Sequence, residues 1–388
     1  MNFLQSALRS LTMTKPSPEA LVESLRRAIA AAEDALAASA TAADGADYAT
    51  LSRVAADGRN PQAAAASQRL DRVGGELRAV KNALLGGGAP VAATARPHGD
   101  ESVSSARSSG TSEEDAGDQR EAGELARMAC EGDLLMVVAG HLRVMGFEAR
   151  KDAVLIFNNL LKAETAGCSA VDRVCADDAA VLAALLRGYD TQEIALNCGA
   201  MLRECLKHEA PTRAVLNDAY FWKFFDLVSV NNFDVASDAF TTFKDLLVRH
   251  QDIAVDFVDS NYDKFFEHYK LLLTSDNYVT RRQSLKLLGE MLLERSNFPV
   301  MTKFIASADN LKLVMNLLLD NRKNIQFEAF HIFKIFVANP NKTSSVKSIL
   351  LKNRDKMIAY LSDFLTDRDD EQFQEDRGVV LEEIQDLE

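Results

Sequence analysis

Apolar residues recur along the C-terminal two thirds of the chain with the spacing of helices. From about Leu125 to Leu365 they return every three or four residues, in successive segments that are separated by short breaks. No segment sustains the strict alternation of apolar and polar residues that marks a half-buried strand. The pattern therefore predicts a series of amphipathic α-helices.

Five of these segments resemble one another. They are 152–161, 194–205, 235–247, 280–293 and 324–337, and each contains a pair of residues, mostly a small one before a large one (Ile156/Phe157, Cys198/Gly199, Ala239/Phe240, Ser284/Leu285, Ala329/Phe330). A second apolar residue follows each pair (Leu160, Leu202, Phe243, Leu288, Phe333), at steps of about 42, 41, 45 and 45 residues. Such a period is typical of HEAT and armadillo repeats, in which stacked helix pairs share one core. The alternative is a non-repetitive helical bundle in which the pairs recur by chance.

The agreement of four consecutive steps favours an all-α, armadillo/HEAT-like, right-handed helical-repeat solenoid. Composition divides the chain further. An Ala-rich helical segment is predicted for 17–85, a disordered linker or insertion rich in Gly, Ser and Asp for 86–120, the armadillo-like repeats for 121–365, and a partly helical acidic tail for 366–388. Ser17 followed by Pro18 predicts the start of the first helix.

Charge and cysteine content exclude several classes of protein. The net charge of −13 argues against nucleic-acid binding, and no apolar run is long enough to span a membrane. The five cysteines lack CxxC spacing, so Cys198 and Cys205 are predicted to be buried thiols in a reducing, cytoplasmic setting.

Catalytic and metal-binding motifs are missing from the sequence. Phosphate-binding glycine loops, the nucleophile-elbow motif, the HExxH zinc motif and the kinase motifs do not occur, and the six histidines are scattered. We therefore expect neither an enzyme nor a bound cofactor or metal.

Basic residues gather in one part of the chain. Between residues 270 and 356, fifteen lysines and arginines stand against seven acidic residues. Arg282 and Lys286 are one helical turn apart, so they share a face. A basic stripe on successive inner helices would form a concave surface for an acidic partner, although ordinary solvated lysines account for most of these charges.

The C-terminal half resembles a known family over long stretches. The segments EIALNCGAMLRECLKHE (193–209), FDVASDAFTTFKDLL (233–247), NYVTRRQSLKLLGEMLLERSNF (277–298) and NLKLVMNLLLDNRKNIQFEAFHIFKIFVANPNK (310–342) are similar to the calcium-binding protein 39 family, and the similarity covers roughly residues 133–387. The resemblance implies a non-catalytic scaffold that binds Ste20-type protein kinases or pseudokinases.

The resemblance also implies two sets of contact residues. Phe233, Tyr278, Arg282 and Lys286 match a concave face that meets the kinase, and Arg295, Phe298, Met315 and Lys352 match a pocket for a C-terminal tail of Trp-Glu-Phe type. Spacing alone favours Phe298 and Met315 as core residues, and only the resemblance favours the pocket. Ser296 and Pro299 depart from the family pattern beside this pocket.

Two functions remain open at this point. The first is a scaffold that stabilises the active conformation of a kinase, and the second is a helical-repeat adaptor that binds linear peptides without changing kinase activity. Both predict peptide binding, but only the first predicts increased phosphotransfer.

Overall fold

The computed structural model describes residues 16–40, 61–85, 113–131, 133–162, 164–165 and 168–387. They belong to two compact units, Met1–Ala214 and Val215–Glu388. We call these the N-terminal unit and the C-terminal unit, and we treat each by itself. Nearly all described residues are helical, which confirms the predicted all-α, armadillo-like helical-repeat fold.

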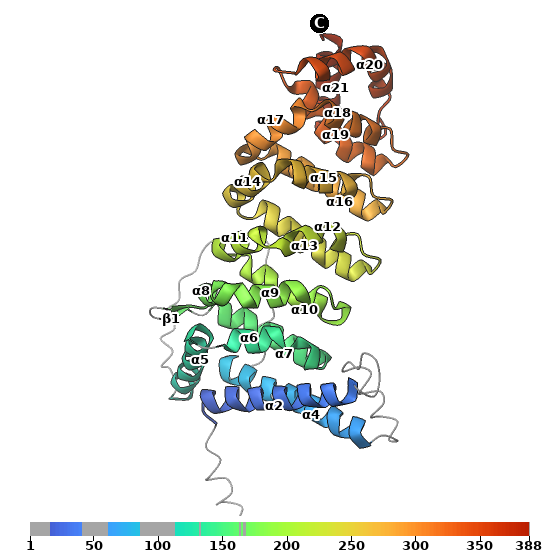
Figure 1. The fold of residues 1–388 in the computed structure, drawn as a ribbon. Coiled ribbons are helices and arrows are strands. Elements are labelled where there is room, and N and C mark those ends of the chain that lie inside the picture. The colour runs from blue at the N-terminus through green and yellow to red at the C-terminus, as the bar shows by residue number, and fades with distance from the viewer. Residues whose placement is uncertain are drawn as a thin grey trace, which may run out of the picture. The chain divides into compact units, whose positions relative to one another are not determined.

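The N-terminal unit begins with two long helices and continues through shorter ones (Figure 1). Its elements are α2 (Pro18–Ala40), α4 (Pro61–Leu85), α5 (Glu113–Glu131), α6 (Leu134–Gly140), η1 (Leu142–Val144), α7 (Phe147–Lys162), β1 (Glu164–Thr165), β2 (Cys168–Ser169), α8 (Ala170–Cys175), η2 (Asp177–Ala179), α9 (Ala180–Gly188) and α10 (Gln192–Cys205). The two-residue strands pair antiparallel. The predicted start at Pro18 is confirmed, and the Ser17 hydroxyl accepts a hydrogen bond from the Ala20 amide.

The C-terminal unit repeats a pattern of short helices followed by a longer one. After α11 (Glu209–Asn217), which spans the division, its elements are η3 (Ala219–Lys223), α12 (Phe224–Leu227), α13 (Phe233–Val248), α14 (Gln251–Ser260), α15 (Tyr262–Leu273), α16 (Tyr278–Leu293), η4 (Arg295–Asn297), α17 (Phe298–Ala306), α18 (Ala308–Leu318), α19 (Lys323–Ala338), α20 (Ser344–Ser362) and α21 (Glu371–Gln385).

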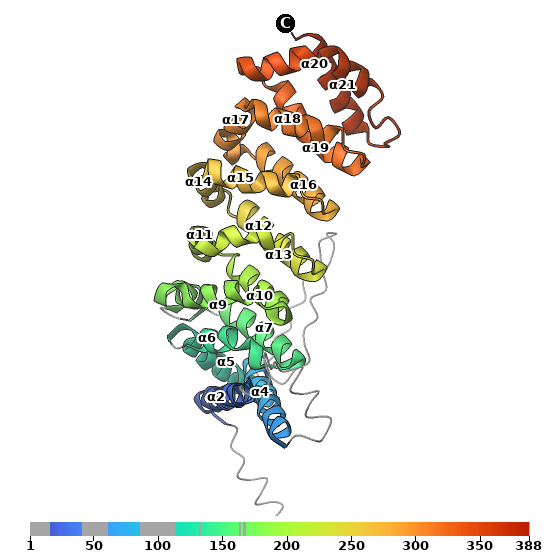
Figure 2. The same ribbon diagram turned by 45° about the vertical axis from the view of Figure 1, so that its right-hand side comes forward.

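The five segments aligned from the sequence lie in α7, α10, α13, α16 and α19. The second apolar residue of every segment is fully buried, as the repeat requires: Leu160, Leu202, Phe243, Leu288 and Phe333. Within the C-terminal unit, α16 packs against both α13 and α19, and the three helices lie side by side (Figure 2). Of the predicted contact residues, Phe233 lies on α13, and Tyr278, Arg282 and Lys286 lie on α16.

Two predicted boundaries can be compared with the structure. Helix α5 begins at Glu113, so the predicted linker 86–120 is wrong for its last eight residues; 86–112 lie outside the described residues. In the sequence this stretch starts with three acidic residues (113–115), and acidic residue types are favoured where a helix begins. The predicted acidic tail contains α21, which buries Phe373, Val380 and Ile384.

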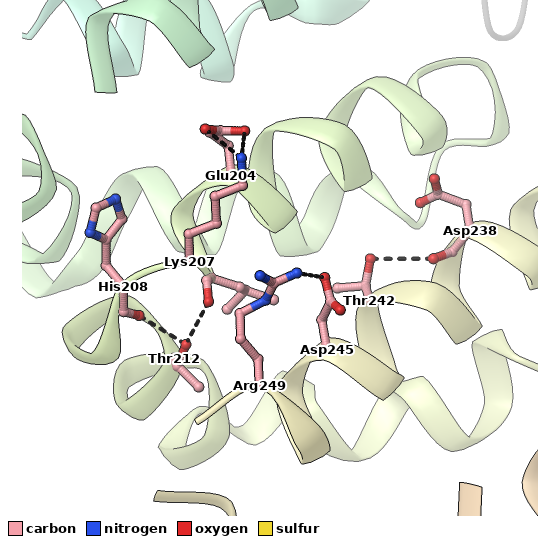
Figure 3. Close-up of polar contacts among 9 residues, drawn as sticks. Glu204, Lys207, His208, Thr212, Asp238, Thr242, Asp245 and Arg249 are labelled. Carbon is pink, nitrogen blue, oxygen red and sulfur yellow. Dashed lines mark hydrogen bonds and ion pairs between the residues drawn. The ribbon is translucent and has the colours of Figure 1, made fainter. Parts of the chain in front are cut away.

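Local polar contacts stabilise several helices (Figure 3). In the N-terminal unit, the Lys207 ammonium donates to both carboxylate oxygens of Glu204, and the Thr212 hydroxyl donates to the His208 carbonyl at 2.9 Å. In the C-terminal unit, the Arg249 guanidinium donates to the Asp245 carboxylate at 3.0 Å. Such contacts partner polar groups near helix ends, where the backbone ladder stops.

The predicted buried thiols are confirmed for Cys198 and Cys205. Burial raises the pKa of the Cys205 thiol far above its ordinary value, so it stays protonated at neutral pH. Because the thiolate is the reactive form, Cys205 acts as a core residue.

Candidate partner-binding surface

Three of the predicted contact residues share one face of α16. The side chain of Asn277 caps this helix by accepting hydrogen bonds from the Val279 and Thr280 amides. Tyr278, Arg282 and Lys286 then follow at intervals of four residues, which places them on one side. Leu285, Leu288 and Leu292 occupy the buried side. We call Tyr278, Arg282 and Lys286 the α16 face.

Tyr278 is held in place by the start of α19. Its hydroxyl accepts a hydrogen bond from the Asn324 amide at 3.1 Å, and the Arg322 guanidinium lies over its ring, 5.3 Å from the centroid. A cation over an aromatic face is attracted by the ring's negative charge density. The ring is therefore oriented before any partner arrives.

The neighbouring arginines Arg281 and Arg282 have different environments. Arg281 is only 15% exposed, and it donates to the Asp320 carboxylate at 2.6 Å and to the Ser275 carbonyl at 2.9 Å. Arg282 is 45% exposed, and its Nε lies 3.6 Å from the nearest oxygen of Glu328. Arg281 is thus bound within the fold, whereas Arg282 presents much of its guanidinium to solvent.

Glu328, on α19, is the carboxylate at this face. Burial raises the pKa of its carboxyl, although Arg282, Lys286 and Arg368 act in the opposite direction. Lys286 is exposed and makes no ion pair within the described part of the chain. Arg368 also pairs with Asp370 at 3.7 Å, so the excess of positive charge at this face comes from Arg282 and Lys286.

Phe233 lies at the first position of α13, beside α16. Asn232 caps the helix by accepting a hydrogen bond from the Val235 amide at 3.0 Å. The Phe233 side chain is 66% exposed, and it borders a cavity of about 280 Å³ between α13 and α16. Val279 and Gln283 line the same cavity. They directly follow Tyr278 and Arg282 in the sequence of α16. The structure thus brings Phe233 next to the α16 face.

The predicted tail pocket is divided between two cavities. Met315 lines a cavity of about 360 Å³ whose walls come from α18, α19 and α20 (Leu318, Leu319, Phe333, Met357, Tyr360). Phe298 lines another cavity, of about 520 Å³, with residues of α16, α17, α19 and α21 (Leu293, Ile305, Ile335, Val379). We call them the Met315 pocket and the Phe298 groove. Met315 and Phe298 therefore line different cavities, which share only α19 as a wall, and the single pocket expected for both residues stays a prediction.

The two predicted pocket cations lie at the surface. Arg295 is exposed in η4, and Lys352 is exposed on α20; neither makes an ion pair among the described residues. Lys356, one turn after Lys352, lines the Met315 pocket itself. Pro299 stands in the first turn of α17, where a proline fits a helix, so this departure from the family pattern does not interrupt the helix.

Sequence reasoning missed several residues of these sites. Glu328 and Asn324 follow Arg282 and Tyr278 by about one repeat length, so the period itself was a signal that could have identified them. Lys356 and Tyr360 follow Lys352 at four-residue steps on the same helix, which was a second signal.

Other classes of site were also sought in the described residues. These ranges contain no group of three or more His, Cys, Asp or Glu side chains that could hold a metal ion. Nor does any helix within them have the length and apolar character needed to cross a membrane.

Comparisons with known proteins agree with the sequence resemblance. The family model described as Mo25-like matches residues 101–388. A human protein named calcium-binding protein 39-like is 48% identical over 265 residues, which cover 68% of this chain and 79% of the relative. A Mo25-like protein of Schizosaccharomyces pombe is 47% identical over 266 residues, covering 68% of this chain and 80% of the relative.

Among solved structures, an engineered protein aligns with a TM-score of 0.42 and 16% sequence identity, over 65% of this chain and 96% of its own length.

Proposed function

This chain belongs to the Mo25-like family, and we propose that it is a non-catalytic scaffold that binds a Ste20-type protein kinase or pseudokinase and stabilises its active conformation. The observation that carries the proposal is the α16 face, where Tyr278 is fixed and Arg282 and Lys286 are exposed beside Phe233 and its cavity. The family membership supplies the kinase as the partner class.

The chemistry of this surface suits a partner with adjacent apolar and acidic side chains. Phe233 and Val279 are exposed apolar groups at the rim of a cavity, and exposed aromatic residues beside a cavity are frequent anchors of protein interfaces. Arg282 and Lys286, on the neighbouring part of α16, would attract carboxylates of the same partner. Charge complementarity of this kind mainly sets specificity and association rate.

The proposed mechanism is a shift in the conformational equilibrium of the kinase. A scaffold that binds the active conformation more tightly than the inactive one increases the active fraction. Each tenfold increase in the ratio of active to inactive kinase requires about 1.4 kcal/mol of differential binding free energy. No catalytic group of the scaffold takes part.

This proposal predicts the effect of Arg282→Ala on kinase activation. The substitution removes the guanidinium of the α16 face, so we expect about tenfold weaker binding of a Ste20-type kinase. The scaffold concentration that gives half-maximal phosphotransfer should rise by the same factor. Both quantities can be measured by titrating the purified chain into a kinase assay and into a binding assay.

Lys312→Ala provides the matched control. Lys312 is an exposed cation of the same unit, on α18, and its one ion pair among the described residues is with Asp309 of its own helix. We expect its binding and activation curves to match those of the unsubstituted chain. The scaffold proposal is wrong if the unsubstituted chain binds no such kinase or leaves its phosphotransfer unchanged.

We further propose that the Met315 pocket binds the C-terminal tail peptide. Its lining is mainly apolar, Leu319 at its edge is 65% exposed, and Lys356 and Lys352 lie one turn apart on α20. An aromatic side chain of the peptide would enter the pocket, while a carboxylate pairs with a lysine. Arg295 and Phe298 remain predicted contacts of this peptide, and Phe298 lines the separate Phe298 groove.

A peptide titration tests the pocket. Met315→Ala should weaken the binding of a peptide that ends in Trp-Glu-Phe by about tenfold, because it removes an apolar side chain from the lining of the cavity. Lys356→Ala should weaken the free-acid peptide but not its C-terminally amidated form. Unchanged affinity in both variants would exclude this pocket.

The second candidate function is an adaptor that binds linear peptides. The observation in its favour is that the Met315 pocket is complete without the α16 face. The adaptor is correct instead if the tail peptide binds as expected while a bound kinase keeps its basal rate of phosphotransfer.

A further inference from the structure

Glu328 is an acidic side chain in the middle of the cationic surface. It lies on α19, its side chain is 11% exposed, and Arg282 of α16 covers it at 3.6 Å. Lys286 of α16 and Arg368, which precedes α21, also act on its carboxylate. Every one of these groups belongs to the C-terminal unit.

The contact between Arg282 and Glu328 is loose when compared with its neighbour. Arg281 and Asp320 approach to 2.6 Å, and both side chains are at most 15% exposed. Arg282 and Glu328 are 3.6 Å apart, which is 1.0 Å more than in the first pair and longer than a hydrogen bond. The Arg282 side chain is also 45% exposed. The Arg282 guanidinium can therefore turn outward without breaking a short hydrogen bond.

Among the described residues Glu328 forms its ion pair with Arg282, so it would lose that pair if Arg282 turned away. The charges of Lys286 and Arg368 continue to attract its carboxylate, which reduces the penalty for losing the partner, but that penalty still opposes the release of Arg282. Arg282 is thus both the ion-pair partner of Glu328 and 45% exposed to solvent.

We infer that Glu328 competes with the partner for Arg282. An acidic side chain of the partner has to replace Glu328 as the group that pairs with Arg282, and this competition limits the affinity for acidic partners. The inference rests on the proposed function, because it concerns the same face. It assigns the incoming group as a carboxylate, which can accept two parallel hydrogen bonds from the guanidinium once Glu328 is replaced. Glu328 is then a residue that sets specificity without contacting the partner.

The test compares the unsubstituted chain with Glu328→Gln, which keeps the shape and removes the charge. Because the competing carboxylate is lost, we expect a Ste20-type kinase to bind about three- to tenfold more tightly to Glu328→Gln. The gain should shrink in high salt, and it should be absent when Arg282→Ala is combined with Glu328→Gln. Affinities can be measured by calorimetry at two salt concentrations.

Asp309→Asn is the control for net charge. It removes one negative charge from an exposed position on α18, and its affinity should stay within twofold of the unsubstituted chain. Equal or weaker binding by Glu328→Gln would overturn the inference, as would an equal gain in Asp309→Asn.

Failure of the proposed function can be separated from failure of this inference. If the unsubstituted chain binds no kinase, the scaffold proposal is wrong, and a decaglutamate peptide then serves as the acidic probe. Glu328→Gln should bind that peptide more tightly than the unsubstituted chain does, again only when Arg282 is present. Equal peptide affinities would overturn the competition.

Discussion

Two adjacent arginines of α16 have separate roles. Arg281 joins α16 to Asp320, which follows α18, and it is nearly buried, whereas Arg282 points to the exposed face. Adjacent positions on a helix are about 100° apart, so one can serve the fold while the next serves a surface. A substitution at Arg281 therefore cannot report on partner binding without also changing stability.

Asp320 makes the structural role of this pair testable through pH. Burial by itself would raise the pKa of its carboxyl, but hydrogen bonds from the Arg322 amide and from the Arg322 and Arg281 guanidinium groups lower it below the ordinary 3.8. A carboxyl with a lowered pKa in the folded state stabilises the fold at every pH above its unfolded value. That contribution is lost as the pH falls through the folded pKa.

We expect Asp320→Asn to lower the free energy of unfolding at pH 7 by about 1–3 kcal/mol, because charge-assisted hydrogen bonds are lost. The penalty should be constant down to about pH 5 and should shrink below pH 3.8, the carboxyl's ordinary pKa. Urea unfolding can be followed by the fluorescence of Trp222, the only tryptophan of the chain, which lies in the C-terminal unit.

The control for this prediction is Asp309→Asn. The Asp309 carboxylate also accepts a hydrogen bond from a cation, Lys312, but its side chain is 79% exposed. Exposed ion pairs contribute at most about 1 kcal/mol. A loss in Asp309→Asn as large as that in Asp320→Asn would mean that burial does not strengthen the Asp320 contacts.

At the scale of elements, ion pairs join the long helices of successive repeats. Lys244 of α13 pairs with Glu290 of α16 at 2.7 Å, and Lys334 of α19 pairs with Asp376 of α21 at 2.5 Å. The Arg282–Glu328 contact joins α16 to α19 in the same way, but it is longer. The looser pair lies within the candidate partner-binding surface.

The helices could be predicted from the sequence because their signal is local and repeated. Leu160, Leu202 and Phe243 must all be buried if similar helices stack, so the period alone identified them. The contact between Arg281 and Asp320 spans 39 residues, and the period does not indicate it. Likewise, the separation of Met315 from Phe298 depends on how α17, α18 and α19 pack, which their spacing does not determine.

At the largest scale, each unit of a repeat protein must close its ends. Each repeat buries its apolar face against the neighbouring repeats. A repeat at the end of the stack therefore needs a capping helix that covers its apolar face and turns polar residues outward. In the C-terminal unit α21 fills this role. Its Phe373 ring lies between 5.0 and 6.1 Å from the rings of Phe327, Phe330 and Phe364.

Phe373→Ala should therefore lower the free energy of unfolding by about 3–5 kcal/mol, the usual cost of removing a buried aromatic ring. Val379→Ala, on the same helix but 56% exposed, should change it by less than about 0.5 kcal/mol. Urea unfolding followed by circular dichroism measures both variants. If Phe373→Ala were as mild as Val379→Ala, α21 would be a peripheral appendage; a loss specific to Phe373 means that the acidic C-terminal segment completes the core of its unit.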